Sequence, residues 1–158
     1  MALPPPDPGT TCLITGASSG IGAEIARGLA ARGLGVTLVA RREERLVELA
    51  EEIATAYGVE AEVVTGDVSK ERSRKALINE IDKRGLTVEV LVNNAGFGSG
   101  GRFTTLDAGK VAEDAIKALE SGDRVTVPGA GNQVAALWGQ HLPRSVLLPL
   151  VKRIWPVS

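Results

Sequence analysis

The stretch Thr15-Gly16-Ala17-Ser18-Ser19-Gly20-Ile21-Gly22 (TGASSGIG) places three glycines between an apolar run and a helical pattern. The run before it, residues 11–15, is typical of a buried parallel strand. After it, Ile21, Ile25 and Leu29 recur every four residues, as they do on one face of a helix. Glycines let the backbone approach a ligand, and N–H groups at a helix start favour an anion. The stretch therefore predicts a binding site for a nucleotide diphosphate; the alternative is an ordinary glycine-rich turn.

The same alternation of strand and helix continues along the chain. It predicts right-handed βαβ units and an α/β, Rossmann-like, doubly wound parallel sheet. Five strands are expected in the order 3-2-1-4-5, with the fifth, Arg124 to Val127, beside the fourth. The further elements expected are strands at 36–40, 59–63 and 88–92, a helix at 43–57, a helix capped by Ser69 that stops at Gly85, and a helix at 110–120 with Val111, Ala115, Ala118 and Leu119 facing inward.

Length and composition indicate one globular domain. The chain has 158 residues and a net charge of −1, which argues against nucleic acid as a partner. The single Cys12 has no partner for a disulfide or a zinc site, which favours a reducing cytoplasm, and no metal site is expected. No apolar run reaches the roughly 18 residues of a membrane span. We expect a flexible, proline-rich leader at 1–9, a nucleotide-binding domain at 10–128 and a helical tail at 129–158.

Ligands of such sheets bind beyond the carboxyl ends of the strands. After the second strand, the acidic residue that would bind a ribose 2′-hydroxyl is absent, and Arg41 and Arg42 stand there instead. A guanidinium pairs with phosphate, so this position favours NADP over NAD. The alternative is a solvated charge pair that opens the next helix.

The third and fourth strands also end in polar residues. Asp67 has two interpretations, a hydrogen bond to an adenine amino group or a simple end to the strand. Asn93 and Asn94 would brace neighbouring loops through their amides, while Ala95 and Gly96 leave room for a flat ligand; a plain asparagine turn is the alternative. The expected cofactor-binding residues are Gly16, Ser18, Ser19, Gly20, Ile21, Gly22, Arg41, Arg42, Asp67, Val68, Asn93, Asn94, Ala95 and Gly96.

TGASSGIG, Asp67-Val68 and Asn93-Asn94-Ala95-Gly96, in this order after successive strands, closely resemble the short-chain dehydrogenase/reductase family. The resemblance implies that the glycine motif binds the cofactor diphosphate, that Asp67 contacts adenine and that residues 93–96 stabilise the sheet beside the cofactor. Arg41 looks like the basic residue of NADP-preferring members. The resemblance runs from Thr10 to about Asp107, and resumes from about Ala108 as the family's last crossover helix and final strand.

The catalytic segment of that family is missing between those two blocks. The family carries a serine and a Tyr-x-x-x-Lys pair there, but the only tyrosine of this chain is Tyr57, followed four residues later by Ala61. Hydride transfer to a carbonyl creates an alkoxide that a protein acid must protonate, and the resemblance implies that the tyrosine does so. We therefore expect a chain that binds NADP with very little carbonyl reduction, and we assign no catalytic residue.

Two alternatives remain open at this stage. One is a non-enzymatic interaction or membrane-peripheral protein that works through its apolar, basic segment Leu147 to Trp155. The other is an internally shortened form of a full oxidoreductase, whose parent gene would encode a Tyr-x-x-x-Lys segment between Gly101 and Lys110. A carbonyl or alcohol substrate is expected only for such a parent, and the sequence predicts neither the substrate nor the oligomeric state.

Overall fold

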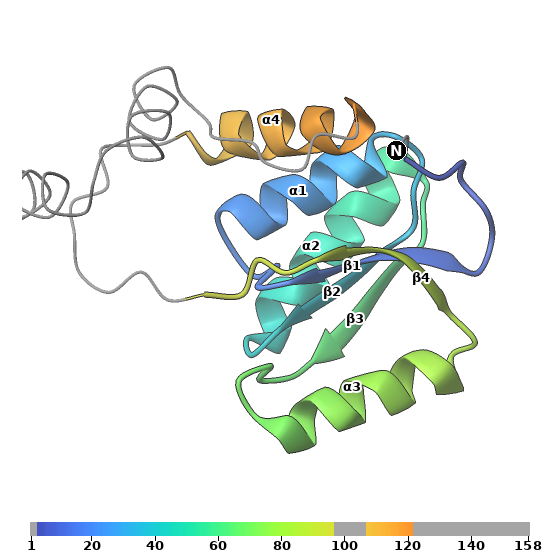
Figure 1. Ribbon diagram of the computed structural model, residues 1–158, viewed down its shortest axis with the longest axis vertical. Coiled ribbons are helices and arrows are strands. Elements are labelled where there is room, and N and C mark those ends of the chain that lie inside the picture. Colours follow the sequence, from blue (N-terminus) through green and yellow to red (C-terminus); the bar gives the residue numbers. More distant parts are fainter. Residues whose placement is uncertain (1–2, 97–106, 122–158) are drawn as a thin grey trace, which may run out of the picture. The chain divides into compact units, whose positions relative to one another are not determined.

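A computed structural model of the chain describes residues 3–96 and 107–121, which alternate between strands and helices (Figure 1). The elements are β1 (Thr10–Thr15), α1 (Ile21–Ala30), β2 (Val36–Ala40), α2 (Glu43–Tyr57), β3 (Ala61–Thr65), α3 (Glu71–Lys83), β4 (Thr87–Val92) and α4 (Ala108–Ser121).

The strands form one parallel sheet in the order β3-β2-β1-β4, so the predicted doubly wound arrangement is confirmed for these strands. In register, Cys12 of β1 lies beside Val36 of β2 and Val90 of β4. Figure 1 shows α1 and α2 on one side of the sheet and α3 on the other. The expected fifth strand, Arg124 to Val127, lies outside the described residues and stays a prediction.

The main core lies between the sheet and the layer formed by α1 and α2. β1 is buried from its second residue onward, and α2 contributes Leu46, Leu49 and Ile53, as its apolar spacing predicts. The buried polar side chains of the described residues are the threonines Thr11, Thr15 and Thr37 of β1 and β2, and the hydroxyls of Thr11 and Thr37 pair at 2.9 Å. A smaller core joins Leu13 and Ile81 on the α3 side.

Helix α4 packs against α1. Ala112 and Ile116 are buried in the main core, and a Cβ placed on Gly28 of α1 would stand 2.5 Å from Ile116 Cδ1. The predicted helix is confirmed. Of the residues predicted to face inward, Val111, Ala115 and Ala118 are half-buried, but Leu119 is exposed, and the fully buried residues are Ala112 and Ile116. Because Gly28 has no side chain, α4 can approach α1 closely at this point, and Ile116 is the residue that fills the space.

Two local predictions need correction. Ser69 does not cap α3: the N-cap is Lys70 without a side-chain cap, and the Ser69 hydroxyl instead donates to Asp67 Oδ1 at 2.7 Å. β3 begins at Ala61, two residues later than the alternating pattern suggested. Gly85, with φ of +66°, follows the end of α3 as expected.

The predicted domain limits are only partly covered by the described residues. In the leader, Leu3 packs against the main core and the Asp7 carbonyl accepts the Thr10 amide at 3.1 Å; the leader's flexibility stays a prediction. The tail at 129–158 lies outside the described residues. Within 3–96 and 107–121, every helix is too short or too polar to cross a bilayer.

Candidate functional site

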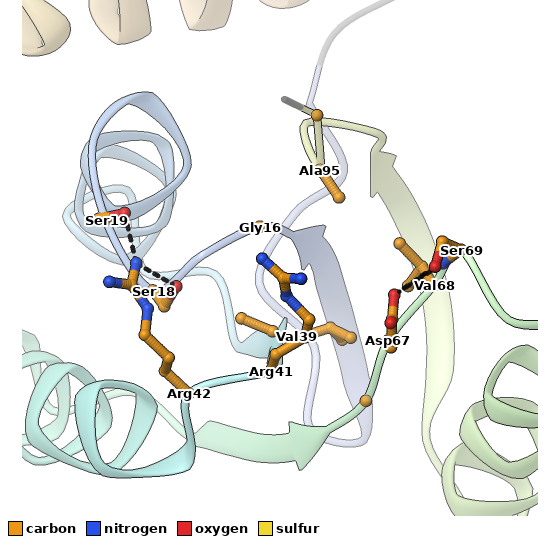
Figure 2. A pocket seen from close by; sticks show the side chains of 13 residues that line it. Gly16, Ser18, Ser19, Val39, Arg41, Arg42, Asp67, Val68, Ser69 and Ala95 are labelled. Carbon is orange, nitrogen blue, oxygen red and sulfur yellow. Dashed lines mark hydrogen bonds between the residues drawn. The ribbon is translucent and has the colours of Figure 1, made fainter. Parts of the chain in front are cut away.

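A pocket of about 390 Å³ opens where the carboxyl ends of β1, β2 and β3 meet (Figure 2). Three turns contribute to it, one after each of these strands, and the segment after β4 adds two small residues. Its lining residues are Gly16, Ser18, Ser19, Val39, Ala40, Arg41, Arg42, Gly66, Asp67, Val68, Ser69, Ala95 and Gly96.

Most of the residues predicted to bind the cofactor share this pocket. The turns bring together Gly16, Ser18, Ser19, Arg41, Arg42, Asp67, Val68, Ala95 and Gly96. Five predicted residues do not line it: Gly20, Ile21, Gly22, Asn93 and Asn94. Whether any of the fourteen contacts a cofactor stays a prediction.

The three glycines of the turn are required for different reasons. Gly16 and Gly20 have φ of +71° and +61°, a left-handed conformation that side chains disfavour. Gly22 lies inside α1, where an added Cβ would stand 2.6 Å from the Gly16 carbonyl oxygen and even closer to Asn94 Nδ2. The Gly16 turn, the start of α1 and the segment after β4 can therefore approach each other only because these residues lack side chains.

Thr15 and Asn94 lock the glycine turn to the end of β4. The Thr15 hydroxyl donates to the Val92 carbonyl at 3.2 Å and accepts the amides of Asn94 and Ala95, each at 3.0 Å. Asn94 Nδ2 donates to the Thr15 carbonyl at 3.1 Å. The bracing predicted for the asparagine amides is thus made by Asn94, while the part played by Thr15 was missed.

Asn93 points elsewhere. It lines a separate groove on the α3 side of the sheet, because successive side chains of an extended segment face opposite ways. Because they are consecutive in an extended segment, the sequence could have predicted that Asn93 and Asn94 face opposite sides of the sheet.

The two arginines after β2 have different surroundings. Arg42 Nη2 donates to the hydroxyls of Ser18 and Ser19, at 3.1 and 2.9 Å, and so ties the turn after β2 to the glycine turn. Figure 2 shows Arg41 in the pocket between this pair and Asp67, with its guanidinium directed toward the Gly16 turn. Two guanidinium groups therefore border one side of the pocket.

Asp67 supplies the negative charge on the β3 side. Its pKa is lowered from 3.8, first by the hydrogen bond from the Ser69 hydroxyl and then by the Ser69 amide, with smaller effects from the positive charges of Lys70 and Arg41. The carboxylate is ionised at neutral pH and available as a hydrogen-bond acceptor. Its amide, in turn, donates to Ser73 Oγ at 2.9 Å, which holds the turn against α3.

The described lining of the pocket contains groups suited to binding a ligand, and it includes no tyrosine, histidine or lysine. Tyr57, at the end of α2, is 41% exposed and is not among the lining residues. Among residues 3–96 and 107–121, no three histidine, cysteine, aspartate or glutamate side chains gather where a metal ion could bind. The arrangement offers guanidinium groups and hydroxyls as hydrogen-bond donors and a carboxylate as an acceptor, a combination that suits a phosphorylated nucleotide.

Part of the chain is similar in sequence to known proteins. The sequence model described as short chain dehydrogenase matches residues 10–118. Among curated relatives, the very-long-chain 3-oxoacyl-CoA reductase of Meyerozyma guilliermondii is 51% identical over 90 residues, which are 56% of this chain and 26% of that protein. A putative ketoacyl reductase of Streptomyces coelicolor is 48% identical over 94 residues, 60% of this chain and 36% of that one.

Solved structures give the same relationship. The L-sorbose reductase of Gluconobacter frateurii complexed with NADPH and L-sorbose has a TM-score of 0.56 and 32% identity, over 73% of this chain and 44% of that one. A metagenomic short-chain oxidoreductase in complex with NADP has a TM-score of 0.54 and 39% identity, over 68% of this chain and 49% of that one. The chain thus spans 26% and 36% of these curated relatives and under half of these solved ones.

Proposed function

Because the chain belongs to the short chain dehydrogenase family, we propose that it binds NADP in the pocket at the carboxyl ends of β1, β2 and β3. We propose further that this chain alone catalyses very little hydride transfer between NADPH and a carbonyl. The observation that carries the proposal is the position of Arg41, a guanidinium in the pocket directly after β2.

The donor set fits an adenosine 2′-phosphate on the β2 side of the pocket. A ribose 2′-hydroxyl is usually held by a carboxylate after this strand, whereas a 2′-phosphate needs a cation. Arg41 would pair with that phosphate. Ser18 and Ser19, whose hydroxyls accept hydrogen bonds from Arg42, line the same pocket as Arg41. The complexes of similar proteins with NADPH and NADP support this cofactor.

The other parts of the cofactor would meet matching chemistry. The Asp67 carboxylate, ionised and on the β3 side, suits the adenine amino group as a hydrogen-bond acceptor. The glycine turn offers backbone N–H groups at the start of α1, whose N-cap, Gly20, carries no side chain that would occupy them. Ala95 and Gly96 leave space beside the turn.

Low turnover follows from the residues that the chain lacks. A bound NADPH supplies the hydride, but the protein must orient the carbonyl and protonate the oxygen as its charge develops. The sequence contains no Tyr-x-x-x-Lys pair to deliver that proton. Steady oxidation of NADPH by the purified chain with any of a panel of ketones would refute this part of the proposal.

The binding part is tested by titrating NADPH and NADH while following nicotinamide fluorescence. The wild type should prefer NADPH. Arg41→Glu should weaken NADPH binding by about tenfold or more, since a charge-assisted hydrogen bond is lost and a repulsion added, while NADH binding changes little. Arg72→Glu, the same change on exposed helix α3, is the matched control and should leave both affinities unchanged. An NADPH preference that survives in Arg41→Glu would remove Arg41 from its assigned role.

A further inference from the structure

The glycine turn after β1 borders two cavities. One is the nucleotide pocket, and the other is a cavity of about 370 Å³ lined by residues of α1 and α2, among them Glu24 and Glu48. Ser18 and Ser19 line both cavities. At the next residue, an added Cβ on Gly20 would meet nothing within 4 Å. This part of the turn therefore has open space beside it in both cavities, and packing contributes little to holding it in place.

Backbone hydrogen bonds anchor the turn before and after the two serines. Before them, the amides of Gly16 and Ala17 donate to the Val39 carbonyl at 2.8 and 3.3 Å. After them, the Gly20 carbonyl accepts the Glu24 amide at 3.2 Å in the first turn of α1. The serines lie between these anchors and outside both β1 and α1. The hydrogen bonds of their side chains are therefore important for their position.

Arg42 supplies hydrogen bonds to both serine side chains. Its Nη2 donates to the hydroxyls of Ser18 and Ser19, at 3.1 and 2.9 Å (Figure 2). This nitrogen carries two hydrogens, so the two serines account for both. The Arg42 backbone is the N-cap of α2, and its carbonyl accepts the Leu46 amide at 3.4 Å. One side chain thus joins the glycine turn to the start of α2.

We propose that Arg42 is a positioning residue, which raises cofactor affinity by holding Ser18 and Ser19, whereas Arg41 sets the preference for a 2′-phosphate. This inference rests on the proposed function, because it gives the two arginines of that pocket separate tasks. The diphosphate that the glycine turn would bind is common to NADPH and NADH. A turn that is already held in place loses less freedom when the ligand binds, so it strengthens the binding of both cofactors by the same factor. The 2′-phosphate is present in NADPH only.

Titration of the full chain with NADPH and NADH, followed by nicotinamide fluorescence, separates affinity from preference. Arg42→Ala should weaken the binding of each cofactor by about fivefold, because two hydrogen bonds from a charged group are lost at the surface. The ratio of the two affinities should stay within about twofold of the wild type. Arg41→Ala should instead weaken the binding of NADPH alone.

The matched control is Arg45→Ala, which removes the same charge in the first turn of α2. Arg45 lines the second cavity but not the nucleotide pocket, so both affinities should stay within about twofold of the wild type. This control separates the loss of a hydrogen-bonded link from the loss of a positive charge near an anionic cofactor.

A second set of variants tests whether Arg42 acts through the serines. In a chain that carries Ser18→Ala and Ser19→Ala, the guanidinium has no serine hydroxyl to hold, so adding Arg42→Ala should change neither affinity by more than about twofold. A guanidinium that contacted the 2′-phosphate directly would keep its full effect in that chain. Urea unfolding of each variant checks the fold, which should stay intact because Arg42 and Ser19 are exposed.

Three results would overturn the inference. They are a loss of NADPH binding alone in Arg42→Ala, an unchanged affinity of Arg42→Ala for both cofactors, and a full effect of this substitution in the chain without the two serines. Each of them leaves the proposed function standing, because the wild type still binds NADPH. A wild type that binds neither cofactor would instead overturn the proposed function, and this inference with it.

Discussion

Gly22→Ala is the substitution that tests the geometry of the glycine turn most sharply. The new Cβ would stand 2.6 Å from the Gly16 carbonyl oxygen and 3.0 Å from its carbon, and it would overlap Asn94 Nδ2. None of these atoms is the end of a flexible side chain, since the Asn94 amide is itself bonded to the Thr15 carbonyl at 3.1 Å. The turn, the start of α1 and the end of β4 must therefore move apart.

The magnitude follows from two opposing effects. Overpacking of this kind costs about 1 to 3 kcal/mol, whereas alanine in place of glycine inside a helix contributes about 1 kcal/mol in its favour. We expect a net loss of about 1 kcal/mol in the free energy of unfolding. The affinity for NADPH should also fall, by about tenfold or more, because Gly16 borders the pocket and the clash displaces Gly16.

Urea unfolding and NADPH titration of the same preparations measure both effects. Gly28→Ala is the matched control: it is the same change in the same helix, and its Cβ also meets an atom at 2.5 Å, but that atom is the mobile tip of Ile116. It should leave NADPH affinity unchanged. If Gly22→Ala bound NADPH as tightly as Gly28→Ala does, the reasoning about the turn would be wrong.

Three further substitutions probe other parts of the account. Thr15→Val should lower the free energy of unfolding, measured in urea, by about 2 kcal/mol, since three backbone groups lose their hydrogen-bond partner. An unchanged midpoint of urea unfolding would show that these hydrogen bonds do not stabilise the fold. Ile116→Ala should cost about 2 to 4 kcal/mol, and a negligible loss would show that α4 does not pack on α1. Burial, and then the charge of Glu89, raises the pKa of the Cys12 thiol from 9.0 to about 11. The raised value means that the thiol stabilises the fold below pH 9 and loses this contribution as the pH rises to 11. The stability advantage of the wild type over Cys12→Ala should thus shrink by about 2 kcal/mol between pH 8 and pH 10.5, and a constant difference would contradict this.

The fold could be predicted where hydrophobic spacing has a single interpretation. The spacing of Leu46, Leu49 and Ile53 indicates the buried face of α2, and the alternation of strands and helices indicates the parallel order of β1 to β4. For α4, the expected inward face ran through Ala115, whereas the buried face runs through Ala112 and Ile116. The choice between them depends on Gly28 in another helix, which no local pattern reveals.

In the candidate site, it was easier to predict which residues line the pocket than which residues form hydrogen bonds with one another. The residues after each strand end share one pocket because parallel strands deliver their carboxyl ends to one edge of the sheet. The partners depend on side-chain directions. Ser69 was expected to cap α3 but bonds to Asp67, and Thr15 looked like the last residue of an apolar strand although its hydroxyl joins two loops. The pairing of Arg42 with Ser18 likewise crosses between two turns.

A crystal structure of the chain with NADP, supported by calorimetry of the same sample, tests the central claim most directly. We predict measurable association, with the 2′-phosphate beside the Arg41 guanidinium and the adenine near Asp67, in the pocket at the ends of β1, β2 and β3. NADP bound at any other surface, or calorimetry that detects no association, would contradict the account.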